Sequence, residues 1–116
     1  MKKVEYILMK LPERFMKSTY KLIWSDEALF NLTDIVNYLE RRWSKREIRK
    51  FAQLLDKQLL RIMGNPLMFA ESDKSSGLRK SVLSSQTTIF YRIKNHEVHL
   101  IALFDNRQNP DKLRKM

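Results

Sequence analysis

The 116-residue chain contains no cysteine, only two glycines and only three prolines. Without cysteine it can form neither a disulfide nor a thiolate metal site. Two glycines leave no basis for a glycine-rich loop that holds phosphate groups. No apolar run approaches the roughly 20 residues that a membrane span requires. These absences exclude a disulfide-stapled domain, and we expect a cytoplasmic protein with no membrane partner.

Positive charge is what the chain has in excess. It carries 23 lysines and arginines against 13 acidic residues, which gives a net charge of +10. Such a balance favours anionic partners: nucleic acid, ribosomes, anionic membranes or acidic proteins. The alternative is an ordinary soluble protein with a basic surface. At this length we expect one domain with a single core.

Residues 1–15 differ from the rest of the chain. Their apolar part is short, carries charges and lacks a small-residue cleavage site, so it does not match a signal peptide. Pro12 interrupts any helix or strand that would continue into the body. We hypothesise that 1–15 are an N-terminal extension introduced by an upstream start codon, and that 16–116 form a single domain.

The first half of the body predicts a strand and two helices. Tyr20 to Trp24 alternate in the manner of a strand. Ser25 is a favourable N-cap, and apolar residues then recur at helical spacing as far as Trp43. Ser44-Lys45-Arg46-Glu47 fits a capping box that opens a second helix, which we expect to end near Gly64. The two helices predict an antiparallel hairpin.

Three further strands are expected at 78–83, 87–94 and 98–104. The last of them is almost continuously apolar, as in a central strand that helices cover. Turns at 84–86 and 95–97 separate the three strands. The fold class is therefore α+β: an N-terminal strand, an α-helical hairpin and a three-stranded antiparallel meander, with the helices packed on one sheet face.

Catalytic chemistry has little support in the sequence. His96 and His99 are three residues apart on an extended chain, which places them on opposite faces and disfavours a metal site. Asp26 and Glu27 fit the first turn of a helix, where the helix dipole favours acids. We expect no metal and no cofactor.

The basic residues form three groups. The first surrounds the helix junction and is interpreted as a solvated helix corner. The second lies on strands, which fix its geometry, and arginine there can grip phosphate or carboxylate with two parallel hydrogen bonds. The third belongs to the C-terminal tail. In order, the groups are Arg41, Arg42, Lys45, Arg46, Arg49 and Lys50; Arg79, Lys80, Arg92, Lys94 and Arg107; and Lys112, Arg114 and Lys115. The strand group could bind a nucleic-acid backbone, pair with the acids of a partner protein, or be structural.

Four short motifs occur in a characteristic order: Asn65-Pro66 with Phe69, Gly77-Leu78-Arg79, Phe90-Tyr91-Arg92-Ile93, and Arg107-Gln108-Asn109-Pro110. Their order and spacing, over residues 19–113, resemble the RelE/ParE superfamily, the toxins of bacterial type II toxin–antitoxin pairs. The resemblance implies a cognate acidic antitoxin, typically encoded alongside, which wraps the toxin with a segment that folds on binding.

The superfamily has two branches with different targets. RelE-like members cut messenger RNA in the ribosome, using basic sheet residues and a tyrosine or histidine near the C-terminus, whereas ParE-like members poison DNA gyrase. Arg79 lies where RelE-like toxins place a basic sheet residue, but Ser81 and Thr88 stand where they often carry others. No tyrosine or histidine follows Phe104. The resemblance therefore favours inhibition of DNA gyrase by binding.

One alternative is a ribosome-dependent mRNA endoribonuclease with an atypical basic site formed by Arg79, Arg92 and Arg107. A second is a degenerate toxin that only binds antitoxin. In each case an acidic and apolar antitoxin segment is expected to lie over the sheet and its edge. The residues that we expect to contact the antitoxin or the target are Arg79, Lys80, Leu83, Tyr91, Arg92 and Arg107.

Overall fold

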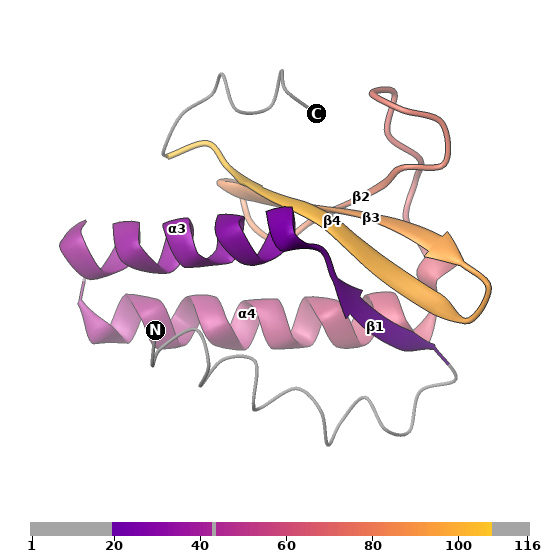
Figure 1. Cartoon of the computed structure of the whole chain (residues 1–116). Helices are drawn as coiled ribbons and strands as arrows, with labels where there is room; N and C mark the ends of the chain where they lie inside the picture. The colour runs from indigo at the N-terminus through magenta and orange to yellow at the C-terminus, as the bar shows by residue number, and fades with distance from the viewer. Residues whose placement is uncertain (1–19, 43, 108–116) are drawn as a thin grey trace.

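The structure is a computed structural model that describes residues 20–42 and 44–107. The expected extension at 1–15 and the basic residues of the C-terminal tail lie outside this range. The described elements are β1 (Lys21–Trp24), α3 (Asp26–Arg42), α4 (Lys45–Gly64), a 3-10 turn η1 (Pro66–Met68), β2 (Arg79–Val82), β3 (Thr87–Lys94) and β4 (Glu97–Asp105) (Figure 1). The predicted α+β order is confirmed, with η1 as an addition.

The four strands form one sheet in the order β1-β4-β3-β2. The last three strands make the expected antiparallel meander, and β1 pairs in parallel with β4. β4 thus has a strand paired along each edge, and its fully buried residues alternate with half-buried ones except at Ala102 and Leu103. Among the described residues, no helix is both long and apolar enough to cross a bilayer.

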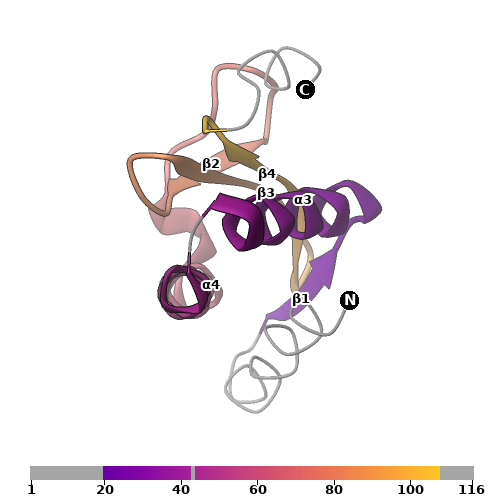
Figure 2. The ribbon, with the colours of Figure 1, turned by 90° about the vertical axis from the view of Figure 1, so that its left-hand side faces the viewer.

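Both helices pack on the same side of the sheet, and the connection from η1 to β2 lies on the other side (Figure 2). Each helix contributes a buried apolar stripe, and alternate residues of β3 and β4 meet it. Burial of each large apolar side chain stabilises the fold by about 1.5–3 kcal/mol. The central members of this core are Leu32, Ile35, Leu39, Leu55, Leu59, Ile62, Ile89, Tyr91, Val98 and Leu100.

The two predicted helix caps have different outcomes. Ser25 caps α3 as expected, because its Oγ accepts a hydrogen bond from the backbone N–H of Ala28 at 3.0 Å. Ser44 has the extended backbone of an N-cap, but its side chain makes no capping hydrogen bond. The predicted capping box is therefore not formed.

Beyond the end of β1, the start of α3 lies along the same edge of β4 and hydrogen-bonds to it. β1 pairs only as far as Leu100, and Ser25 Oγ then donates to the carbonyl of Ile101 at 2.9 Å. Six residues further along the chain, Asn31 Oδ1 accepts a hydrogen bond from the backbone N–H of Leu103 at 3.0 Å. Helix side chains thus satisfy polar groups that a neighbouring strand would otherwise pair. This contact fixes α3 beside β4 and shapes the candidate site.

Candidate functional site

The sheet register divides the predicted contact residues between two faces. Arg79 pairs with Tyr91, and Lys80 pairs with Phe90. Opposed residues of an antiparallel pair point to the same face, and successive residues alternate. Arg79 and Tyr91 therefore face the helices, whereas Lys80 and Arg92 face away from them. The strand cations do not form the single surface that the sequence suggested.

Arg79 on β2 and Leu83, directly after it, both lie on the helix side of the sheet. Arg79 donates from Nη1 to the carbonyl oxygen of Phe69 at 2.6 Å, and its Nη2 lies 4.0 Å from a Glu71 carboxylate oxygen. Arg79 therefore ties the start of β2 to the segment that follows η1. Leu83 packs against the core.

Tyr91 is fully buried, with 0% of its surface exposed. Its hydroxyl donates to the carbonyl oxygen of Pro66 at 2.5 Å. Burial raises the pKa of the phenol to about 12, and the nearby positive charge of Arg79 opposes the rise. The expectation that Tyr91 contacts a partner is corrected accordingly, because the side chain lies inside the core and holds η1 against the sheet.

Stability should fall steeply with pH between about 10 and 12 because of Tyr91. Its folded pKa exceeds the unfolded value of 10.0, so the unfolded chain loses this proton first and stability decreases as pH rises through that window, by about 2–3 kcal/mol. Urea unfolding at pH 9, 10, 11 and 12 measures the slope. Tyr91→Phe should start about 1–2 kcal/mol less stable and show a shallower decline. Parallel declines in the two proteins would contradict the assignment.

Arg92 projects from the face of the sheet opposite the helices, where it hydrogen-bonds to the loop before β2. Its Nη1 donates to the carbonyl oxygen of Ser76 at 2.6 Å, and its Nη2 donates to Ser75 Oγ at 2.7 Å. Gly77 has a φ of +76°, which favours glycine, and a Cβ there would lie 3.3 Å from Arg92 Nη1. The guanidinium thus holds the loop before β2 over the outer face, and it keeps only part of its donor capacity for a ligand.

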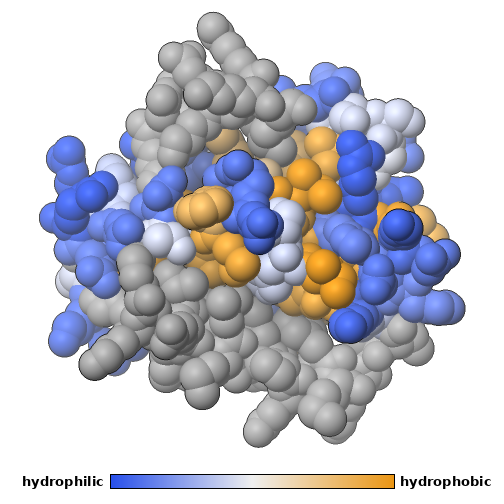
Figure 3. Space-filling view, viewed as in Figure 1, coloured by the Kyte–Doolittle hydropathy of each residue, from blue (hydrophilic) through white to orange (hydrophobic). Residues whose placement is uncertain are grey.

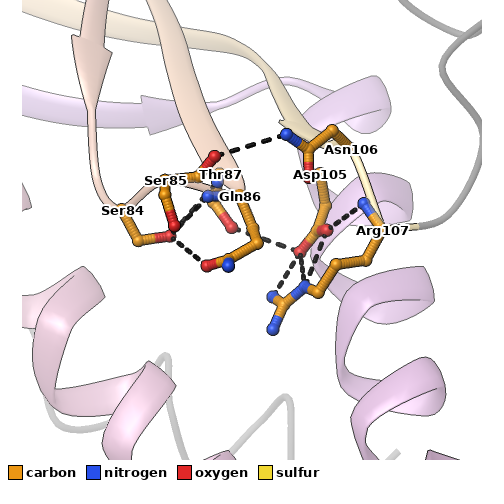
Figure 4. Close-up of polar contacts among 7 residues, drawn as sticks. All are labelled: Ser84, Ser85, Gln86, Thr87, Asp105, Asn106 and Arg107. Carbon is orange, nitrogen blue, oxygen red and sulfur yellow. Dashed lines mark hydrogen bonds and ion pairs between the residues drawn. The ribbon is translucent and has the colours of Figure 1, made fainter.

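Arg107 forms an internal ion pair at the far end of β3 and β4 (Figure 4). Its Nη2 lies 2.5 Å from Asp105 Oδ2, and its Nε donates to Asp105 Oδ1 at 2.9 Å. The Asp105 side chain is completely buried and also accepts a hydrogen bond from Thr87 Oγ1 at 3.2 Å. The hydrogen bond to Asp105 raises the pKa of Arg107 further, although burial opposes it. This pair anchors the chain where it leaves the sheet.

The three arginines of the nuclease alternative therefore do not converge. Arg79 faces the helices, Arg92 faces the opposite side, and Arg107 lies beside Thr87, four residues from Tyr91 along β3. Each one also binds protein acceptors. The His99 side chain is engaged within the protein, because its Nε2 lies 2.9 Å from Glu97 Oε1. In the described ranges, no group of three His, Cys, Asp or Glu side chains could hold a metal ion.

A groove of about 590 Å³ occupies the outer face, beside β4. A register shift between Phe90 and Tyr91 leaves Ile101 as an extra residue of β4 and bends the strand at this point. One wall is α3 and the other is the loop that Arg92 holds. The side chains that line the groove include Glu27, Phe30, Asp34, Arg92, Ala102 and Phe104. Figure 3 shows the side of the molecule seen in Figure 1, on which apolar side chains appear at the centre with polar ones around them.

Phe30 is the feature of the groove that sequence reasoning missed. It lies on α3 outside the buried stripe and is 68% exposed. A large aromatic on the polar side of an amphipathic helix was the available signal, since exposed apolar surface marks interaction sites when it is contiguous. Glu27 and Asp34 flank it on the same helix, and Arg92 stands across the groove. The rim therefore carries both signs of charge around an apolar floor.

Comparisons with known proteins identify the family and the fold of the chain. A family model described as the ParE toxin of type II toxin-antitoxin system, parDE, matches residues 22–110. A search of curated proteins found no match. Among solved structures, the chain is similar to the chromosomal ParDE system from P. aeruginosa, at 17% identity and a TM-score of 0.65, over 75% of this chain and 96% of that one.

Two further structures share the fold. The E. coli DinJ-YafQ complex aligns at 9% identity and a TM-score of 0.54, over 78% of this chain and 98% of that one. YafQ from E. coli strain BL21(DE3) aligns at 12% identity and a TM-score of 0.51, over 76% of this chain and 94% of that one. These identities show a common fold, while the family model distinguishes the branch and covers most of the chain. The chain belongs to the ParE toxin family of type II toxin–antitoxin systems.

Proposed function

We propose that this toxin inhibits bacterial growth by binding DNA gyrase and that a cognate acidic antitoxin neutralises it. The observation that carries the proposal is the separation of Arg79, Arg92 and Arg107, each already hydrogen-bonded within the protein. RNA cleavage needs a base, a cation and an acid around one phosphate. Their dispersal supports a binding toxin over a nuclease, as does the match to the ParE family model.

The outer-face groove is the proposed antitoxin site. Phe30 offers an exposed aromatic anchor, and Ala102 and Phe104 form an apolar floor. Arg92 can form an ion pair with an acidic residue of the bound segment. Glu27 and Asp34 on the opposite rim favour a basic residue at that side of the bound segment. This proposal replaces a segment lying over Arg79 and Leu83, because both face the helices.

Strand addition at the edge of β2 is a weaker alternative for the antitoxin. The chain already covers the start of that edge, because Glu71 bridges to Arg79 and the backbone N–H of Lys80 donates to the Ala70 carbonyl at 3.1 Å. An added strand would find its unpaired backbone groups only toward the end of β2. The groove therefore provides the larger surface for a folded or extended segment.

Induced expression in bacteria without the antitoxin distinguishes the possible functions. Gyrase poisoning should trap DNA breaks and induce the SOS response while transcripts stay intact. Codon-positioned cuts in translated messages, with no SOS induction, would instead establish the ribosome-dependent endoribonuclease. Normal growth together with intact antitoxin binding would show a degenerate toxin.

A further inference from the structure

The side of α4 that faces away from the core carries a row of cations. At 3.6 residues per turn, Arg46, Lys50, Lys57 and Arg61 fall within about 60° of one line along the helix. The centre of the row lies about 150° around the helix from Leu55, the centre of the buried stripe. All four side chains are exposed. They form a straight positive surface, which we call the α4 row.

The α4 row extends over most of the helix without an acid in it. From Arg46 to Arg61 the helix rises by roughly 22 Å. Arg49 and Gln53 border or interrupt the row and are also exposed. The two acids of α4, Glu47 and Asp56, are turned by about 70° and 110° from the centre of the row, on opposite sides. In the described part of the chain, the recorded ion pairs involve no member of the row.

Only Arg61 has an evident structural role in the row, because it lies in the last turn of α4, where a cation is favoured, and its guanidinium is 6.0 Å from the centre of the Phe69 ring. The spacing of the row does not otherwise stabilise α4. Arg46 and Lys50, and likewise Lys57 and Arg61, are like charges four residues apart, a spacing that destabilises a helix. Arg46 also lies in the first turn, at the positive end of the helix dipole. Cations spaced in this way are better explained by an external anion than by the stability of the monomer.

The shape of the row favours a phosphate backbone over an acidic protein. Protein interfaces obtain most of their affinity from buried aromatic and apolar anchors, and the row contains none. Duplex DNA carries one negative charge per about 1.7 Å of its axis, so a straight row of this length faces a continuous line of phosphates. The groove, by contrast, has an apolar floor and mixed charges, which suits a protein segment.

The row and the groove also belong to different parts of the molecule. α4 lies at the edge of the helical layer, as the end-on view in Figure 2 shows, while the groove is formed by α3, β4 and the loop on the other side of the sheet. We propose that the α4 row binds the backbone of duplex DNA without sequence specificity. This extends the proposed function without depending on it, because the binding needs neither gyrase nor antitoxin.

Fluorescence anisotropy with the full chain and a labelled 20-base-pair duplex tests the proposal. The variant R46Q/K50Q/K57Q and the control K21Q/K74Q/K94Q each lower the net charge from +10 to +7, and all six positions are exposed. We expect the row variant to bind at least about tenfold more weakly at 50 mM salt. Its slope of log affinity against log salt should fall by about 2 to 3.

The control variant should bind within about threefold of the native chain, since it loses the same charge elsewhere. Equal weakening in both variants would show that net charge alone drives the binding and would overturn the proposal. The absence of duplex binding by the native chain at 50 mM salt would overturn it as well. Thermal unfolding of both variants verifies that the fold is retained.

Discussion

Replacing Phe30 with alanine should weaken binding of the cognate antitoxin by about 30- to 300-fold and leave the fold intact. Phe30 is 68% exposed, so it contributes little to the core, and it stands in the wall of the groove. An aromatic anchor that becomes buried in a complex is typically worth about 2–3.5 kcal/mol at an interface. Calorimetric titration with the product of the adjacent gene, which is expected to be the antitoxin, measures the loss.

Leu67→Ala provides the matched control for Phe30→Ala. Leu67 is 64% exposed and lies on η1, outside the groove. Its truncation removes exposed apolar surface of similar extent and should leave antitoxin affinity within about twofold. Native affinity in the Phe30 variant, or equal losses in both variants, would remove the groove from the antitoxin interface.

Asp105→Ala should destabilise the fold by about 3 kcal/mol, the largest effect expected for any single polar side chain here. The Asp105 carboxylate is completely buried and accepts hydrogen bonds from Arg107 and from Thr87 Oγ1. Its removal leaves a partly buried guanidinium and a buried hydroxyl without their acceptor, and each costs free energy. Urea unfolding at pH 7 measures the change.

Glu71→Ala is the corresponding control at the surface. Glu71 lies 4.0 Å from Arg79 and its side chain is 57% exposed, so its loss should cost less than about 1 kcal/mol. If Asp105→Ala were as mild as Glu71→Ala, the Asp105–Arg107 pair would not hold the end of the sheet. The double variant Asp105→Ala/Arg107→Ala should recover part of the loss, because it removes the unpaired charge.

The order of elements was predictable because each one carries a local signal. Ser25 opens α3, Gly64 ends α4, and the apolar run of β4 indicates a strand covered on both sides. These features depend on neighbours within a few residues. The capping box at Ser44 and Glu47 was also predicted from local spacing, but the Ser44 side chain makes no capping hydrogen bond.

The faces of the sheet were not predictable from local pattern. Whether Arg79 and Arg92 share a face depends on the register between β2 and β3, and a shift of one residue moves every side chain to the other face. The same holds for Tyr91, which was expected to contact a partner but lies on the buried face, where its hydroxyl donates to the Pro66 carbonyl oxygen. The contact residues proposed from the sequence therefore lie on both faces of the sheet and not on one.

The groove was less predictable still, because distant segments build it. Asn31 on α3 accepts a hydrogen bond from Leu103 on β4, 72 positions away, and the far wall depends on Arg92 holding Ser75. Only Phe30 left a trace in the sequence, as an aromatic on the polar side of α3. Contacts between segments that are far apart in the sequence leave no hydrophobic periodicity from which they could be predicted.

The central claim is that the chain acts by binding gyrase, and a supercoiling assay with purified components tests it directly. The account predicts that the purified chain blocks supercoiling of relaxed plasmid by gyrase, accumulates cleaved DNA, and loses both effects when the antitoxin is added. Unimpaired supercoiling at a stoichiometric excess of the chain, with cleavage of messenger RNA in a translating ribosome reaction, would contradict it.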